Sequence, residues 1–195
     1  CGWRREQHPD VSLYNKLHDI EWTSGRVGDI RACGGDAVFR VAALHGAGSW
    51  DPSILAGEEP ELCGRLRDRG WRIVRLDVPM TAHDAEMTQL SQFLLRERRT
   101  GYGALDVLLR AGPEQHPNFA TITRRARLWT IGPALLLVIG SLMGASLLGW
   151  IGLLAGPVAV LLACGLQTAR LTHSFARVGL SISEALAASA LTLLG

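Results

Sequence analysis

The sequence has 195 residues and a formal net charge of +2 at pH 7, with 48% hydrophobic and 19% charged residues. A charge so close to neutral excludes the strongly basic footprint of nucleic-acid-binding proteins, so we expect no nucleic-acid partner. The four cysteines match neither a zinc-ligand spacing nor a disulfide framework: Cys1, Cys33, Cys63 and Cys164. We therefore expect free thiols in a cytoplasmic domain.

Charged residues are concentrated in the first two thirds of the chain. Residues 1–127 contain 18 of the 20 Lys and Arg and 17 of the 18 Asp and Glu, whereas the 42 residues from Leu128 to Ala169 contain none. We predict a polar domain at 1–85, an amphipathic helix with a linker at 86–127, and a membrane region at 128–195. No signal-peptide pattern precedes the first charged residues and both ends are abrupt, so we expect a fragment of a longer protein.

The first candidate ligand-binding segment consists of Gly34, Gly35 and Asp36. Two consecutive glycines allow the backbone to approach a ligand closely. The same residues are typical of a turn that an Asp side chain closes, which is the structural alternative. After this segment, residues 40–44 favour a short helix, and residues 48–52 a turn.

Adjacent carboxylates, Glu58 and Glu59, mark the start of a predicted helix. Pro60 suits its first position and Gly70 the residue just past its end. The helix dipole favours acidic residues at a helix N-terminus in any protein. The pair is therefore either structural or a candidate catalytic base.

An alternating run at 71–78 predicts a strand that Pro79 ends, and His83 follows. Ligands of open α/β sheets bind at the carboxyl ends of strands, where a His can bind a divalent cation or a phosphate. The alternative is a surface His that caps a helix starting near residue 86.

Residues 86–110 predict an amphipathic helix with a basic cluster, Arg96, Arg98 and Arg99. These arginines have two candidate partners. They either attract anionic lipid headgroups or face an active site and hold a diphosphate.

The uncharged run is about twice as long as the roughly 20 residues that one membrane-spanning helix needs. We predict spans near 129–148 and 153–170, separated by the glycines of residues 149–152. A third apolar segment, from about 185, is too short to cross. Basic residues flank the pair of spans on both sides, which predicts a multi-pass protein of the inner (plasma) membrane with its polar domain in the cytoplasm. The alternative is a buried helical hairpin in a soluble core.

The order of motifs resembles the second half of a family 2 glycosyltransferase. The motifs are Cys-Gly-Gly-Asp-Ala, Gly-Ser-Trp-Asp-Pro, Ala-Gly-Glu-Glu-Pro-Glu-Leu-Cys-x-Arg-Leu-Arg, Gly-Trp-Arg-Ile and Met-Thr-x-His-Asp, within residues 1–110. The resemblance implies an α/β fold, namely the C-terminal half of a Rossmann-like GT-A domain followed by the interfacial helix and the transmembrane hairpin. It also implies inversion at the anomeric carbon and places the nucleotide-binding half, with its Asp-x-Asp metal motif, upstream of Cys1.

The resemblance assigns roles to individual residues. Glu59 matches the catalytic base, where the family usually has Asp, and Glu58 its modulator. His83 matches a histidine that helps to bind the metal, Mg²⁺ or Mn²⁺. Substrate-binding positions are Gly34, Gly35, Asp36, Trp71, Gln92 and Arg96. Gln92 and Arg96 resemble the Gln-x-x-Arg-Trp signature of processive members, although their spacing is one residue longer and no Trp follows.

The sequence thus predicts a membrane-associated enzyme that moves a sugar from a nucleotide-sugar donor to a hydroxyl of a sugar or lipid-linked acceptor, in the synthesis of cell-surface polysaccharide or glycolipid. We expect the 195 residues alone to be inactive, because the donor half would be missing. Two alternatives are a noncatalytic membrane-anchored interaction subunit and a metal-dependent hydrolase built on His83, Asp84 and the two glutamates.

Overall fold

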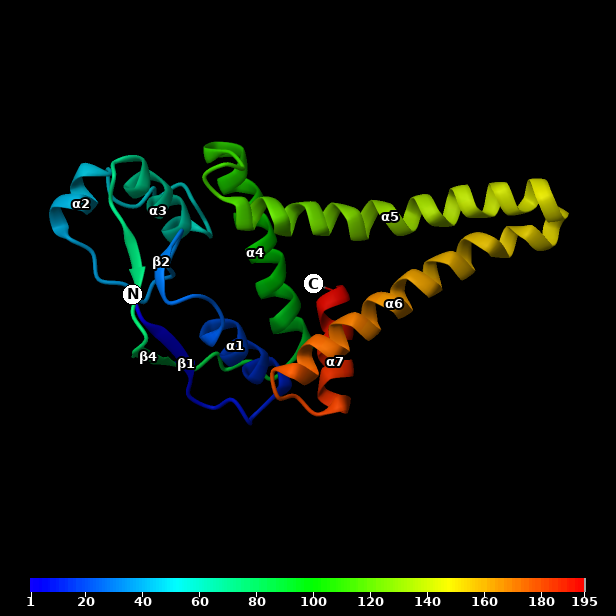
Figure 1. The fold of residues 1–195 in the computed structure, drawn as a ribbon, viewed down its shortest axis with the longest axis horizontal. Helices are drawn as coiled ribbons and strands as arrows, with labels where there is room; N and C mark the ends of the chain where they lie inside the picture. Colours follow the sequence, from blue (N-terminus) through cyan, green and yellow to red (C-terminus); the bar gives the residue numbers. More distant parts are fainter. Residues whose placement is uncertain (195) are drawn as a thin grey trace. The chain divides into compact units, whose positions relative to one another are not determined.

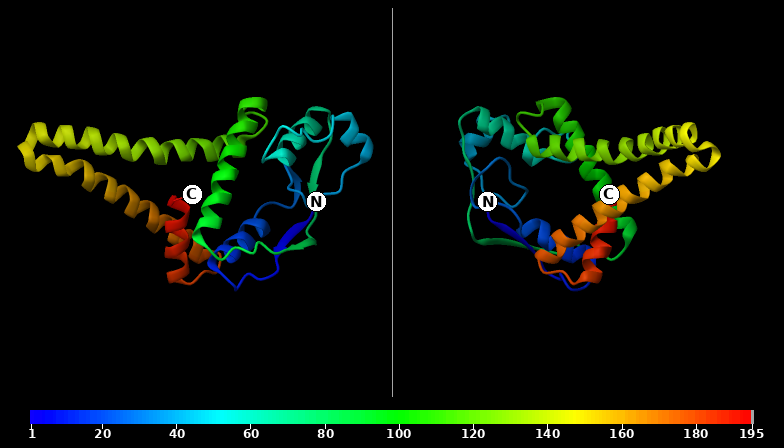
Figure 2. Two further views of the ribbon diagram at one scale, coloured as in Figure 1. Left: turned by 180° about the vertical axis from the view of Figure 1, so that it is seen from behind. Right: turned by 45° about the vertical axis from the view of Figure 1, so that its right-hand side comes forward.

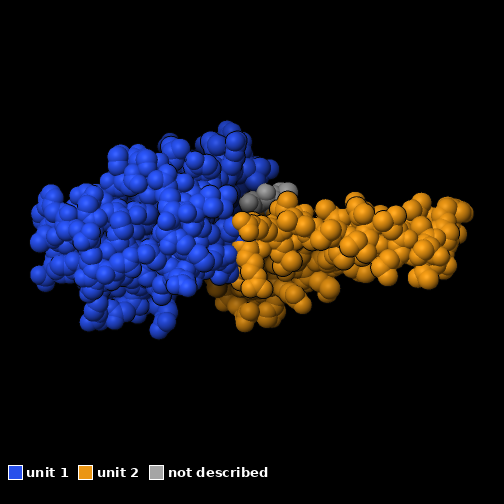
Figure 3. Space-filling model, turned by 90° about the horizontal axis from the view of Figure 1, so that it is seen from above, with its two compact units in different colours: residues 1–123 blue, residues 124–195 orange. Residues whose placement is uncertain are grey.

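The structure is a computed structural model that describes residues 1–194. Packing divides the chain into two compact units, residues 1–123 and residues 124–195 (Figure 3). The units are described separately below, and Figure 1 labels their elements.

The first unit contains four short strands and four complete helices. In chain order they are β1 (Trp3–Glu6), α1 (Leu13–Thr23), β2 (Gly28–Ile30), α2 (Val41–Gly46), α3 (Glu58–Asp68), β3 (Ile73–Arg75), β4 (Pro79–His83) and α4 (Leu90–Ala111). Strand β1 pairs in parallel with β4, and β2 pairs antiparallel with β3. The described residues therefore form two separate two-stranded sheets.

The predicted Rossmann-like α/β fold is wrong. The chain is 64% helical and only 8% strand, so its architecture is mostly helical. The predicted strand at 71–78 explains the error, because only Ile73–Arg75 of that run pair with another strand. Pro79 begins the next strand instead of ending this one, which is a position that proline tolerates because it needs no ladder N–H there. The alternation of apolar and polar residues at 71–78 indicated a strand. Among the described residues, however, only β2 pairs with this run, and the pairing covers three residues.

Helix α3 anchors the core of the first unit. Leu62 and Leu66 are buried on one of its faces, as predicted, and pack with Ala43 and Ala47. The helix begins at Glu58, after Gly57 in the left-handed conformation (φ 86°), so Pro60 is its third residue and not its first.

The end of α3 confirms the role predicted for Gly70, which has φ 82°. The N–H of Gly70 donates to Arg67 O at 2.8 Å, and that of Trp71 to Leu66 O at 3.1 Å. This pair of bonds is a Schellman motif, which satisfies carbonyls that the helix leaves unpaired.

Helix α4 begins four residues later than predicted and buries one face within the first unit. Gln89 and Gln92 form a capping box at its start. Its buried residues include Gly103, where an added Cβ would lie 2.5 Å from Ala56 O. The close approach of α4 to residue 56 therefore depends on this glycine.

The second unit is built on long helices. Helix α5 (Pro117–Leu148) enters it from the first unit, the 3-10 helix η1 (Gly149–Leu154) follows, and α6 (Ala155–Arg177) and α7 (Ile182–Leu194) complete it. Helices α5 and α6 converge on η1 in every view (Figure 2). The helix thus breaks at the predicted glycines of residues 149–152.

Small residues allow the two helices to meet at this tip. A Cβ on Gly140 would lie 3.0 Å from the Cα of Gly156, and one on Gly144 or Gly152 would overlap the opposite backbone. Ser141 Oγ also donates to Leu153 O at 2.8 Å. Small residues and interhelical hydrogen bonds of this kind are typical of helices that pack in membranes.

The helical segment Pro117–Arg177 is long and apolar enough to cross a membrane, and only 11% of its most apolar window is buried. Helix α7 is a shorter apolar helix that packs against α6, where Thr172 Oγ1 and Ser189 Oγ share a hydrogen bond of 3.0 Å. The apolar core helix of a soluble domain is buried by the rest of the protein. This helical segment is mostly exposed, and in that respect it differs from such a core helix.

Candidate active site

The loop that contains Gly35 lies against the first turn of α3. A Cβ added to Gly35 would lie 3.2 Å from Oε1 of Glu59 and 3.8 Å from Nη2 of Arg4. Gly34 has more space, since its added Cβ would come no closer than 4.0 Å to Arg4 Nη2. Two segments that the sequence singled out separately, the glycine loop and the acidic helix start, are therefore in contact.

The carboxyl group of Glu59 is half-buried and its pKa is raised. Burial is the largest cause, because it penalises the charged form, and the negative charge of Glu58 adds to it. The positive charge of Arg4 opposes the shift. A carboxylate with a raised pKa is a better general base near neutral pH.

A cleft of about 450 Å³ lies beside the two glutamates. Glu58, Glu59 and Gly35 line it together with the aromatic rings of Phe39 and Trp50. These rings meet edge to face, with their centroids 5.7 Å apart. The cleft thus combines apolar aromatic surface with two acidic groups at one edge, the composition expected of a small-molecule site.

The next residue of the loop, Asp36, is held by two donors. Arg4 Nε and Thr81 Oγ1 each donate to its carboxylate at 2.5 Å. Burial would raise the pKa of Asp36, but the hydrogen bonds from Thr81 and Arg4 outweigh it and hold the pKa below its ordinary value. Asp36 therefore stays ionised and fixes the loop to β1 and β4.

His83 lies at the end of β4, close enough to Asp36 to lower its pKa further. Its exposed ring meets the ring of Trp22 edge-on, with the centroids 5.3 Å apart. The guanidinium of Arg4 lies 5.1 Å from the centroid of the Trp22 ring. His83, Asp36 and the glycine loop are thus neighbours.

A smaller cleft of about 240 Å³ is lined by residues that include Gly34, Asp36, Arg4, Trp22 and Arg75. Arg75 stacks over Trp3, 4.7 Å from the ring centroid, and its buried Nε has no hydrogen-bond partner among the described residues. The sequence analysis missed these two arginines and Trp22. They belong to β1, β3 and α1, which are separated in the sequence, so no local pattern places them together.

Three predicted substrate-binding residues lie outside this cluster. Gln92 accepts the N–H groups of Thr88 and Gln89, both at 2.9 Å, so its side chain caps α4. Arg96 pairs with Glu21 and with Glu97, both at 3.1 Å. Both side chains are thus engaged with neighbouring residues, although Glu21 also lines the smaller cleft.

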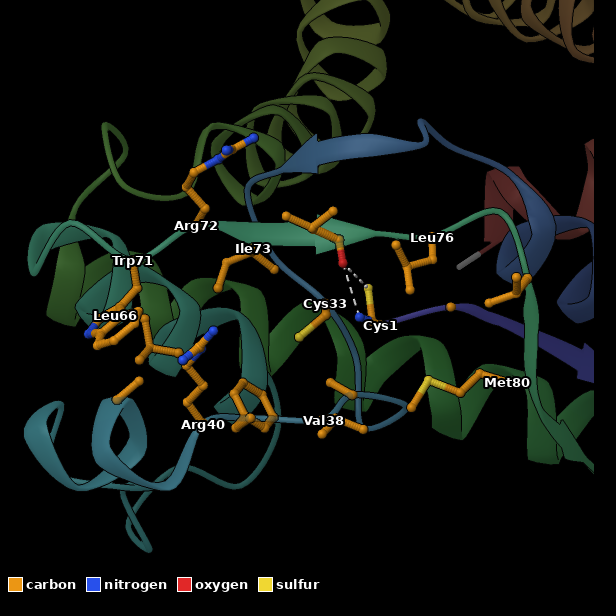
Figure 4. Close-up of a pocket in the computed structure, with 16 residues that line it drawn as sticks. Cys1, Cys33, Val38, Arg40, Leu66, Trp71, Arg72, Ile73, Leu76 and Met80 are labelled. Atoms are coloured by element: carbon orange, nitrogen blue, oxygen red, sulfur yellow. Dashed lines mark hydrogen bonds between the residues drawn. The ribbon is translucent and has the colours of Figure 1, made fainter.

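The third, Trp71, is 39% exposed and lines a different cleft of about 380 Å³ (Figure 4). The lining of this cleft is mainly apolar, with Ile73, Leu76 and Met80 among its residues. Cys1 also lines the cleft, and its backbone nitrogen donates to Val74 O at 3.0 Å. This cleft contains neither of the two glutamates, and its polar lining residues include Arg40 and Arg72.

Within residues 1–194, no group of three or more His, Cys, Asp and Glu side chains is arranged to hold a metal ion. His83 faces Trp22, and Asp36 is occupied by Arg4 and Thr81. The donor set around His83 therefore does not fit a metal site by itself.

Comparisons with protein-family models, curated proteins and solved structures found no match for this chain. The resemblance to family 2 glycosyltransferases thus remains a prediction from the sequence motifs, and the geometry described above is the independent basis for a functional proposal.

Proposed function

We propose that this chain supplies the acceptor side of an inverting glycosyltransferase that works at a membrane and uses a nucleotide-sugar donor. One observation carries the proposal: the carboxylate of Glu59, with its raised pKa, lines an aromatic cleft and touches the glycine loop. The proposal concerns the chemistry of this site and does not require the Rossmann-like fold.

In the proposed reaction, Glu59 accepts the proton of an acceptor hydroxyl. The hydroxyl oxygen attacks the anomeric carbon of the donor from the face opposite its diphosphate. The bond between that carbon and the diphosphate oxygen breaks, and the nucleoside diphosphate leaves with the electron pair. The attack inverts the configuration, and the proton remains on Glu59 until solvent removes it.

The aromatic cleft supports this role for Glu59. Phe39 and Trp50 offer apolar faces on which the C–H groups of a sugar ring can pack, while Glu58 and Glu59 supply acceptors for its hydroxyl groups. A sugar in the cleft would place a hydroxyl next to the proposed base. The charge of Glu58 would help to keep the pKa of Glu59 raised.

The smaller cleft supports a position for the leaving diphosphate. Arg75 lines it with an Nε that has no hydrogen-bond partner among the described residues, together with Arg4, which is held by Asp36. Guanidinium groups stabilise developing phosphate charge through paired N–H donors. A divalent cation, Mg²⁺ or Mn²⁺, remains a prediction of the resemblance, and no step proposed here passes through it.

The apolar hairpin supports a membrane location. We propose that α5 and α6 both cross the plasma membrane, with the basic residues at their outer ends, Arg124, Arg125, Arg127, Arg170 and Arg177, on the cytoplasmic side. The first unit would then also be cytoplasmic. This location favours a lipid-linked or membrane-delivered acceptor.

Product analysis tests the proposal. The chain, joined to the donor-binding half that the proposal requires, is reconstituted in lipid nanodiscs and incubated with labelled nucleotide sugars, with and without a polyprenyl-phosphate or oligosaccharide acceptor. The proposal expects label in the acceptor with inverted anomeric configuration. Release of free sugar without an acceptor would favour the hydrolase alternative, and binding of neither donor nor acceptor would favour a noncatalytic interaction subunit.

A further inference from the structure

Two cysteines on different segments meet beside the candidate site. Cys33 Sγ and Cys63 Sγ lie 3.5 Å apart, although 30 positions separate them in the sequence. Both are buried, with exposed fractions of 6% and 0%. Cys33 directly precedes the glycine loop, and Cys63 lies on α3, four residues after Glu59. The pair thus joins the same two segments that form the candidate site.

The geometry is close to that of a disulfide. A disulfide has sulfur atoms about 2.05 Å apart, so the two atoms need to approach by roughly 1.5 Å. Cys63 is fixed in the middle of α3, but Cys33 belongs to a loop that continues into Gly34 and Gly35. Glycines give this loop the backbone freedom for such a movement.

The electrostatics of the pair favour a reactive thiolate. The hydrogen bond from Cys33 is the largest cause that lowers the pKa of Cys63 to about 7, against the opposing effect of burial. The same interaction raises the pKa of Cys33, which therefore keeps its proton. A thiolate beside a protonated thiol is the arrangement from which disulfides form through a sulfenic acid.

Small molecules have a route to the Cys33 side of the pair, and they reach the fully buried Cys63, whose sulfur lies 3.5 Å from that of Cys33, past the Cys33 side chain. Cys33 lines the apolar cleft shown in Figure 4 and also a second cleft of about 210 Å³ beside His116. Hydrogen peroxide is small enough to enter clefts of this size.

We propose that Cys33 and Cys63 form a reversible, peroxide-sensitive disulfide that ties the glycine loop to α3. The Cys63 thiolate attacks hydrogen peroxide, which gives a sulfenic acid and hydroxide. The Cys33 sulfur then attacks the sulfenic sulfur, forms the S–S bond and releases water, with the Cys33 proton completing that water molecule. The two thiols lose two electrons in total, and an external dithiol reverses the reaction by exchange.

Peptide mapping after peroxide treatment tests this proposal without any assumption about glycosyl transfer. The full chain in detergent is reduced, freed of reductant and titrated with hydrogen peroxide. Remaining thiols are then alkylated and the protein is digested for mass spectrometry. The expected product is a peptide pair linked through Cys33 and Cys63 that dithiothreitol separates.

Single variants provide the controls. Cys33→Ser and Cys63→Ser should abolish the linked peptide, whereas Cys1→Ser and Cys164→Ser should leave its yield unchanged. Should the first two variants fail to fold, phenylarsine oxide offers a measurement on the unmodified chain. It should remove two titratable thiols per bound arsenic, both in the peptides of Cys33 and Cys63. The proposal is overturned if peroxide gives sulfinic acid at either residue without a link, or if the main link involves Cys1 or Cys164.

Discussion

Gly35 lies directly against the carboxylate of Glu59, so that a methyl group at position 35 would be 3.2 Å from Glu59 Oε1. A contact this short requires the carboxylate to move by a few tenths of an ångström. The glycine therefore helps to set the position of the proposed base, and its backbone does not need a positive φ to do so.

Gly35→Ala should reduce glycosyl transfer by roughly 10-fold, because a misplaced base loses part of the advantage of orientation. Gly101→Ala, at an exposed position of α4, is the matched control, since none of the described residues lies within 4 Å of its added Cβ. The comparison uses kcat measured with saturating donor and acceptor. Equal losses in the two variants would show that the contact with Glu59 has no influence on the rate.

The raised pKa of Glu59 predicts two opposite effects of pH. The acid limb of the rate profile should lie above the ordinary glutamate value of about 4.3, because only the ionised carboxylate accepts a proton. Glu58→Gln should move this limb to lower pH by removing a like charge. A limb unchanged in Glu58→Gln would contradict the influence of the neighbouring carboxylate.

The contribution of Glu59 to folding stability should fall as pH rises, whereas the rate of transfer should increase. A folded-state pKa above the unfolded value favours the protonated carboxyl in the fold, so this contribution is complete below about pH 4.3 and is lost as pH rises through the folded pKa. Glu59→Gln keeps the neutral form at all pH values. It should therefore unfold at a higher temperature than the unmodified protein at pH 7.5, which thermal melts in detergent can measure.

His116 predicts a loss of stability in mild acid. Its side chain is buried, Nε2 has no hydrogen-bond partner among the described residues, and burial together with the charge of Arg67 lowers its pKa. The unfolded chain therefore binds a proton more readily than the folded one below about pH 6.5, and unfolding is favoured as pH falls from there to the lowered folded pKa.

His116→Phe should flatten this pH dependence, since a phenyl ring can still stack on Phe119. Urea unfolding between pH 5.5 and 7.5 gives the comparison. If the free energy of unfolding changes with pH equally in His116→Phe and in the unmodified protein, the acid sensitivity belongs to other groups.

Arg65 fastens α3 to the preceding turn. It donates to both carboxylate oxygens of Glu61 and to Ser49 O, each at 2.7 Å, and also to Ala47 O. Arg65→Lys keeps the charge but loses the planar set of donors. We expect it to lower the free energy of unfolding by about 2 kcal/mol, as is typical for lost hydrogen bonds to charged groups. Arg69→Lys, on the same helix end, should change it by less than about 0.5 kcal/mol.

Local patterns in the sequence were reliable where neighbouring residues decide the structure. The buried face of Leu62 and Leu66, the left-handed Gly70 and the helix break after Leu148 all depend on residues within a few positions. The sheet prediction failed because pairing is decided by distant partners: the residues of β1 pair with residues of β4 that are 76 or 77 positions away. The same pairing brings Arg4 to Asp36, which no periodicity indicates.

The residues of the candidate site could likewise be predicted where a local motif marked them. The motifs predicted Glu59, the glycine loop, Asp36 and His83, which the structure brings together, whereas Gln92 and Trp71 have local roles in capping and apolar packing. The prediction for Arg96 depended on a spacing from Gln92 that matches the family signature only loosely. In the structure its guanidinium is engaged by Glu21 and Glu97.

The most direct measurement for the proposed function is transfer by Glu59→Gln beside Glu114→Gln, each made in the chain joined to the donor-binding half that the proposal requires, with binding of nucleotide sugar and acceptor measured for each. Glu114 is exposed and lies outside the clefts described above, so the same chemical change there is a matched control. The account predicts that Glu59→Gln retains binding but loses at least about 100-fold in kcat, as expected for removal of a general base, while Glu114→Gln keeps full activity. Transfer by Glu59→Gln at the unmodified rate would contradict the account.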